Sequence, residues 1–212
     1  TLRGSERVSR SKIDWEMGIY AVLTQIGQKK ESDFGEPIGM LEDCHKRILY
    51  FLKTLVTLAR TCKEQPLDHD RRISLEKALR YFREAAPKHT ADEEESLFPR
   101  LRRIDTPQVR EIFSRLDDLE ADHRHADSQH LEVETIGRRW LLTGVLNFED
   151  GARLTTVLES LSRLYDRHIS LEETEIFSVA RTILPDSAKQ ILGQEMAKRR
   201  GVVLSDSNAN IV

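Results

Sequence analysis

The stretch LTTVLESLSRLYDRHISLEE, residues 154–173, decides the fold class. It is rich in Leu, Glu and Arg, which are strong helix formers. Its apolar residues recur every three or four positions, as expected for a helix with one buried face. A second stretch, SLEKALRYFREAA at residues 74–86, has the same character, and only 10 Gly and 6 Pro interrupt the 212 residues. We therefore predict an all-α protein.

The overall composition narrows the class of protein further. The chain has 33 Lys and Arg against 36 Asp and Glu, a net charge of −3, and 39% hydrophobic residues, which is typical of a folded domain with a sizeable core. Without a basic excess, nucleic acid is not expected as a partner. No apolar run reaches the roughly 20 residues that a membrane-spanning helix needs, so no membrane association is expected.

The two cysteines, Cys44 and Cys62, fall on one predicted helix. They are too far apart there to form a disulfide bond with each other. A chain with so few cysteines is not a disulfide scaffold, and we expect a cytoplasmic setting.

Four long helices and a short one account for most of the chain. Their predicted ranges are 38–62, 71–104 with an irregularity at Pro87, 107–144 with Thr106 as the N-cap, 147–185, and 187–200. Long helices joined by short loops are antiparallel neighbours, so we predict an up-down-up-down four-helix bundle. The predicted organisation is an N-terminal arm (1–37), the bundle (38–184), and a short C-terminal helix with a polar tail (185–212).

Ionisable side chains occupy positions that should be buried in this bundle. They are His45, His89, Glu93, His123, His168 and Glu172. His89 and Glu93 are four residues apart on the core face of one helix, and His168 and Glu172 repeat that arrangement. Burial of six such groups without partners would cost many kcal/mol. A shared metal centre would satisfy all of them.

An internal repeat supports this interpretation. LEDCHKR at 41–47 matches LEADHRH at 119–125, with an offset of 78 residues. HTADEEESLF at 89–98 matches HISLEETEIF at 168–177, with an offset of 79 and the shared form H-x-x-x-E-x-x-x-x-F. The distances from the connecting loops place the histidines at similar heights, so all four helices can direct ligands to one place.

The donor set suggests which metals fit. Four imidazoles and two carboxylates suit first-row transition ions, and iron, zinc and manganese are all compatible. Six ligands are too many for one tetrahedral zinc. Ferritin-type sites use a Glu-x-x-His order that differs from the His-x-x-x-Glu order here. The two carboxylates are well placed to bridge a pair of ions.

On these residues the chain resembles the hemerythrin-like family, which has a histidine–histidine–glutamate cation-binding domain, in its bacterial six-ligand form. The resemblance covers about residues 38–184. It implies two Fe ions, oxo- or hydroxo-bridged, held by the six residues named above. It also implies a small diatomic or peroxide ligand (O2, peroxide or nitric oxide) and a role in sensing, scavenging or oxidoreduction.

Two departures from the oxygen-carrying hemerythrins argue against simple O2 transport. Their fifth histidine is replaced here by Asp127. Their last carboxylate is an aspartate five residues after its histidine, whereas Glu172 is four residues after His168, and Glu173 occupies the fifth position. An open coordination position favours reactivity over reversible binding.

Two other hypotheses stay open. One is an iron-responsive or signalling module without turnover, in which metal binding stabilises the fold. The other is a structural bundle without metal. The sequence does not decide whether the protein is an enzyme, and it leaves a protein partner or a homo-oligomer open.

We also predict where the residues next to the six site residues lie. Asp92, Glu94, Glu95 and Glu173 are expected to face solvent. Asp127 is a lesser candidate for a carboxylate near the metal, and His130 is expected at the core boundary or beside the ligands. Phe98 and Phe177 are expected to pack and to keep water out of the site.

Overall fold

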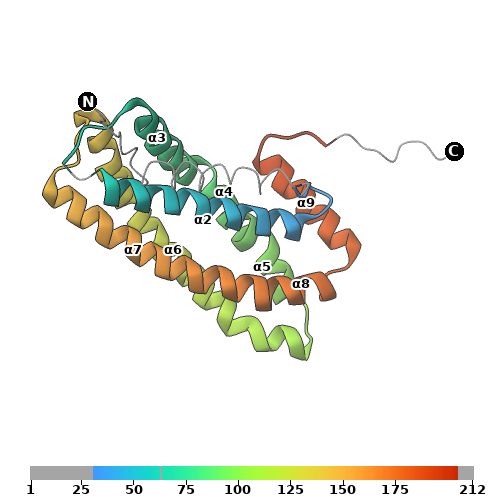
Figure 1. The fold of residues 1–212 in the computed structure, drawn as a ribbon. Coiled ribbons are helices and arrows are strands. Elements are labelled where there is room, and N and C mark those ends of the chain that lie inside the picture. The colour runs from blue at the N-terminus through green and yellow to red at the C-terminus, as the bar shows by residue number, and fades with distance from the viewer. Residues whose placement is uncertain (1–30, 63, 205–212) are drawn as a thin grey trace, which may run out of the picture. The chain divides into compact units, whose positions relative to one another are not determined.

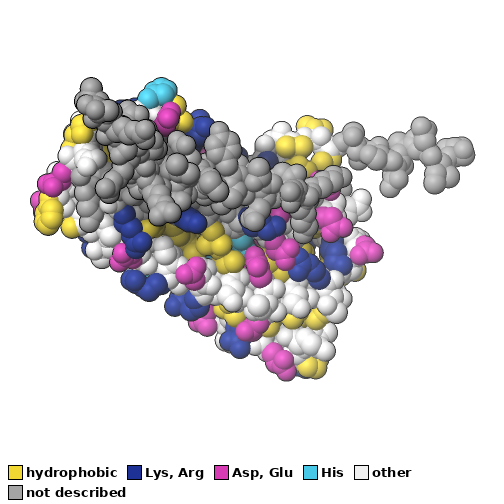
Figure 2. Space-filling model, viewed as in Figure 1, with side chains coloured by type: hydrophobic (Ala, Val, Ile, Leu, Met, Phe, Trp, Pro, Cys, Tyr) yellow, Lys and Arg dark blue, Asp and Glu magenta, His cyan; other side chains and the backbone are white. Residues whose placement is uncertain are grey.

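The computed structural model describes residues 31–62 and 64–204, and we find no β-strand within these ranges. The all-α prediction is therefore confirmed. Most of the predicted arm (1–37) lies outside the described residues. Among the helices that are described, none is long and apolar enough to cross a membrane. The face visible in Figure 2 carries acidic and basic side chains side by side.

The described helices form four rods, residues 37–61, 69–102, 107–143 and 148–183, followed by a shorter helix at 186–199 (Figure 1). The rods pack in a ring in which the first contacts the second and fourth, and the third contacts the second and fourth. The elements in chain order are α2 (Pro37–Thr61), α3 (His69–Glu84), α4 (Ala86–Ala91), η1 (Asp92–Leu97), α5 (Phe98–Arg102), α6 (Pro107–Thr143), α7 (Phe148–Leu171), η2 (Glu172–Ile176), α8 (Phe177–Ile183) and α9 (Asp186–Arg199).

Local side-chain chemistry sets the ends of the rods. The side chain of Asp68 accepts a hydrogen bond from the Arg71 amide at 2.8 Å, and Asn147 does the same for Asp150. Thr106 caps α6 as predicted, and Gly144 ends that helix in the left-handed conformation with φ 76°.

The second and fourth rods are not the continuous helices that we predicted. The second is interrupted at Ala85, two residues before Pro87, because proline lacks an N–H and its ring clashes with the carbonyl four residues earlier. Each of these rods also contains a π-helical segment, η1 or η2, that the prediction missed. A π-helical turn pairs residues five apart, so it changes which side chains share a face.

Two apolar clusters form the core, with a layer of polar side chains between them. Along α2, Leu41 belongs to one cluster and Ile48 to the other, and His45 lies between them. Along α6, Leu119 and Ala126 flank His123 in the same way. The polar layer therefore lies at one depth on two different rods.

The short helix α9 packs against α2 and η1 beside the bundle (Figure 1). Its buried residues Leu192 and Met196 join the cluster that contains Leu41, with Phe34 packed against it. At Gly193 the backbones approach so closely that an added Cβ would lie 1.9 Å from the carbonyl oxygen of Phe34. Glycine is therefore required for this packing of α9.

We predict that Gly193→Ala destabilises the protein by about 1–3 kcal/mol, because the clash is with backbone and α9 must shift to relieve it. Chemical unfolding measures the effect. Gln194→Ala, an exposed neighbour on the same helix, is the control and should change stability little. Equal stability of the Gly193 variant and the wild type would contradict the packing described here.

Candidate metal centre

The structure brings all six predicted site residues together in the polar layer of the core. His45 comes from α2, His89 from α4, Glu93 from η1, His123 from α6, His168 from α7 and Glu172 from η2. All six are buried, and both glutamates are 0% exposed. Side chains from all four rods therefore meet at a common depth.

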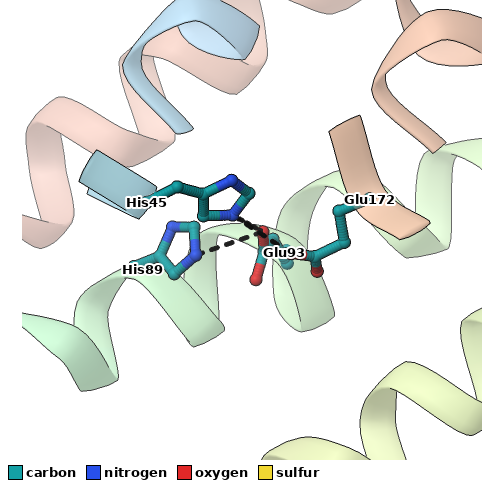
Figure 3. Close-up of side chains that lie close together, drawn as sticks. All are labelled: His45, His89, Glu93 and Glu172. Atoms are coloured by element: carbon teal, nitrogen blue, oxygen red, sulfur yellow. Dashed lines mark ion pairs between the residues drawn. The ribbon is translucent and has the colours of Figure 1, made fainter. Parts of the chain in front are cut away.

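Their donor atoms form two overlapping groups. His45, His89, Glu93 and Glu172 make up one group (Figure 3), and His123, His168 and Glu172 make up the other. Within each group the potential ligand atoms all lie within 4.8 Å of one another. Glu172 belongs to both groups.

Each carboxylate faces histidines from both halves of the repeat. The two oxygens of Glu172 lie 3.1 Å from Nε2 of His45 and 3.2 Å from Nε2 of His168. The oxygens of Glu93 lie 3.4 Å from Nε2 of His89 and 3.5 Å from Nε2 of His123. This arrangement suits two carboxylates that bridge a pair of cations.

The hydrogen-bonding state of these atoms tests whether cations fit. Both carboxylate oxygens of Glu93, both of Glu172 and Nε2 of His45 are buried without a hydrogen-bond partner in the described part of the chain. Each buried unsatisfied polar atom costs about 1–3 kcal/mol. Transition-metal cations would satisfy this nitrogen and oxygen donor set. The residues present therefore fit a metal centre.

Without a cation, the charges in this layer compete. Burial lowers the pKa of His45, but the surrounding Glu172, Glu173 and Glu93 outweigh burial and raise it to about 11. Burial and the charge of Glu172 raise the pKa of Glu93 well above its usual range. Burial opposes ionisation of Glu172 too, but His168 and His45 lower its pKa. The layer thus retains protons that metal ions would replace.

Two further carboxylates orient the histidine rings. Oε1 of Glu173 lies 2.9 Å from Nδ1 of His45, and Oε1 of Glu94 lies 2.8 Å from Nδ1 of His123. Glu94 follows Glu93 of the first half and binds His123 of the second. Glu173 follows Glu172 of the second half and binds His45 of the first. Carboxylates in this position fix the tautomer and orientation of metal-binding imidazoles. The prediction that Glu94 and Glu173 simply face solvent is therefore wrong, although their side chains are 34% and 40% exposed.

The family model of the hemerythrin HHE cation-binding domain matches residues 36–180. The chain belongs to this family. It is also similar to an uncharacterised protein of Haemophilus influenzae, with 30% identity over 171 residues that cover 80% of this chain and 92% of the relative. The hemerythrin HHE domain binds cations, so metal binding accounts for the buried histidines and glutamates. Helix α9 lies beyond the matched region.

His89 and His168 have no such ring-orienting carboxylate partner in the part of the chain that the structure describes. Their outer nitrogen, Nδ1, is the ring nitrogen that points away from the two glutamates. Nδ1 of His168 lies 3.6 Å from Asp122, which is beyond hydrogen-bond distance, and Asp122 itself accepts hydrogen bonds from Arg167. Nδ1 of His89 and Nδ1 of His168 are both buried without a hydrogen-bond partner in the described residues. In each half, therefore, one histidine has an outer carboxylate as partner and the other has no hydrogen-bond partner for its Nδ1 within the described residues.

The prediction that Asp92 faces solvent is also wrong. Although we expected it to face solvent, it is 0% exposed and pairs with Arg199 and Arg200. Glu95 is exposed as predicted. No local signal could have revealed the partners of Asp92, because they lie 107 and 108 residues away in the sequence.

Five further residues with individual predictions lie outside the two donor groups. Asp127 is exposed on α6. Phe98 and Phe177 are fully buried, and Phe177 stacks on His45 with ring centroids 5.3 Å apart. Cys44 and Cys62 are buried and free. The predicted packing of the two phenylalanines is therefore confirmed, and their exclusion of water stays a prediction.

His130 lies beside the centre, in contact with Tyr165. Nε2 of His130 and the Tyr165 hydroxyl are 2.9 Å apart, and Phe82 stacks on the imidazole. Burial lowers the pKa of His130 to about 4. Tyr165 also lines a small cavity at the centre, together with His45, His89, His123 and His168.

We predict that His130 makes stability depend on pH. Because its pKa is lower in the folded state than in the unfolded state, the unfolded chain binds more protons between pH 6.5 and 4. Its contribution to the free energy of unfolding is present above pH 6.5 and falls as the pH drops toward 4. In His130→Gln, the loss of stability between pH 7 and pH 5 should be smaller by up to about 2 kcal/mol.

Urea unfolding at the two pH values, at matched metal content, measures this difference. His69→Gln, at an exposed position, serves as the control. An identical pH dependence in the wild type and His130→Gln would show that the imidazole is not held neutral in the folded protein.

Proposed function

We propose that the chain binds two iron ions in this layer and that the loaded protein reacts with O2, peroxide or nitric oxide. The observation that carries the proposal is the pair of fully buried glutamates, each placed between histidines from both halves of the repeat. His45, His89, Glu93, His123, His168 and Glu172 would hold the ions. When bound, the iron pair supplies the redox chemistry and the open positions for a small ligand.

The size of the cavity favours a small ligand. It is lined by the four histidines with Ile48, Ala86, Thr90, Tyr165 and Ile169, and it has room for little more than a water-sized molecule. A diatomic molecule or peroxide fits this limit better than an organic substrate does.

The surrounding residues control what reaches the centre. Phe177 covers one face of the His45 ring, and Phe98 lies parallel to His123 with ring centroids 6.5 Å apart. Besides the four histidines, the polar side chains of the cavity wall are Thr90 and Tyr165. The Tyr165 hydroxyl is hydrogen-bonded to His130, so that bond holds the phenol in place. These residues exclude bulk water and orient one hydroxyl near the cavity.

Iron analysis of the purified chain tests the proposal. We expect roughly two irons per chain, as in other di-iron carboxylate bundles. His168→Leu should lose at least half of the iron, because it removes one of the three side chains of the second donor group. His125→Leu, at an exposed position on the same bundle, should retain it. A wild-type chain that purifies without iron, together with a His168→Leu variant that is more stable, would favour the structural bundle instead.

Reactivity separates the two metal-dependent hypotheses. We expect the visible absorption of the iron-loaded protein to change on addition of peroxide or nitric oxide, while zinc-loaded protein, which has no redox chemistry, should not respond. A large increase in melting temperature on iron binding, without consumption of either ligand, would instead support an iron-responsive module.

A further inference from the structure

Asp92 is a fully buried carboxylate directly before Glu93, at the start of η1. Arg199 binds one of its oxygens, and Arg200 binds the other at 2.5 Å. Both arginines lie at the C-terminal end of α9, and their side chains are 20% and 19% exposed. Removing the arginines would leave the Asp92 charge buried without a partner, so these contacts constrain η1 strongly.

Arg199 also spans the π-helical segment. Besides Asp92, its guanidinium binds the hydroxyl of Ser96 at 3.1 Å and the carboxylate of Glu95 at 3.2 Å. Asp92 is the first residue of η1 and Ser96 is the last but one. One side chain of α9 therefore joins both ends of the turn that carries Glu93.

The other half of the repeat lacks this support. The offset of 79 residues places Leu171 at the position of Asp92 and Glu175 at the position of Ser96. Glu175 pairs with Arg115 of α6, but these side chains are 39% and 46% exposed. Exposed ion pairs contribute little. The segment η1 is thus held through a fully buried carboxylate by two arginines of a helix beyond the matched hemerythrin HHE region, and η2 by a surface pair within that region.

The shape of η1 matters for the direction of Glu93. Glu93 and Phe98 are five residues apart, and both are fully buried. A regular α-helix turns about 100° per residue, so residues five apart lie about 140° from each other around the axis. The π-helical turn brings both onto the core face. If η1 relaxed to α-helical geometry, Glu93 and Phe98 could not both keep their positions.

We infer that Arg199 and Arg200 are positioning residues of the metal centre. Acting through Asp92, they hold the π-helical turn that directs Glu93 toward His89 and His123, and so set how tightly the centre binds metal. The inference rests on the proposed iron site and extends it to a helix outside the matched domain.

Anaerobic titration of the metal-free 212-residue chain with Fe²⁺, in competition with a coloured chelator, tests the inference. In Arg199→Gln/Arg200→Gln, at least one of the two Fe²⁺ ions should bind about 10–100-fold more weakly than in the wild type, the usual effect of losing residues that orient ligands. The double Lys variant, which keeps both charges, should recover part of the affinity.

Glu195→Gln is the matched control. It removes the ion pair between α9 and Arg100 of α5, at 2.8 Å, without touching Asp92. It should lower stability but leave the Fe²⁺ affinity within about twofold, because both arginines keep their bonds to Asp92. A purely structural role of α9 would instead affect both variants alike.

The outcomes separate the two proposals. Wild-type affinity for both ions in the folded double variant would overturn the role of Arg199 and Arg200 and leave the iron site standing. A wild-type chain that binds no Fe²⁺ would overturn both. If the double variant does not fold, Arg200→Gln alone decides. It leaves the contacts of Arg199 in place and should still weaken binding several-fold, and unchanged affinity would overturn the inference.

Discussion

Four histidines and two glutamates share one layer in the middle of an otherwise apolar bundle, and the rest of the structure depends on neutralising that layer. The donor atoms face one another at 3.1–3.5 Å with five of them lacking hydrogen bonds within the described residues. Such an arrangement is unfavourable for a bare protein core. The layer divides the apolar core into two clusters, so the rods pack against one another on both sides of it.

The two halves of the repeat build this layer together rather than side by side. Glu94 of the first half supports His123 of the second, and Glu173 of the second supports His45 of the first. Neither half has a complete set of ligands or of ring-orienting carboxylates. The symmetry fails at Asp92, where α9 adds charges that the second half does not have.

Much of the fold and of the site follows from short-range patterns. Apolar spacing located the rods, and the caps at Thr106 and Gly144 marked their ends, because both signals act within one or two turns. The repeat H-x-x-x-E-x-x-x-x-F identified all six residues that meet in the core. The same motif contained a signal that our prediction did not use. Glu and Phe five residues apart cannot share a face of an α-helix, and that spacing indicates a π-helical turn.

Long-range partners could not be predicted in the same way. The acidic run at 92–95 has the composition of a solvated surface, yet its first residue is fully buried. What distinguishes Asp92 from Glu95 is the placement of α9, which depends on packing at Gly193 and Phe34 rather than on any local pattern. The outer carboxylates Glu94 and Glu173 were missed for a related reason, since each contacts a histidine of a different rod.

The sequence separation of Asp92 from its two arginines has a consequence for biosynthesis. Arg199 and Arg200 are translated more than 100 residues after Asp92, so the ribosome has made all four rods before either guanidinium exists. The nascent chain therefore carries every histidine and glutamate of the centre while the carboxylate beside Glu93 is still without its counter-charges. Maturation of the site can be completed only after the C-terminal helix has left the exit tunnel.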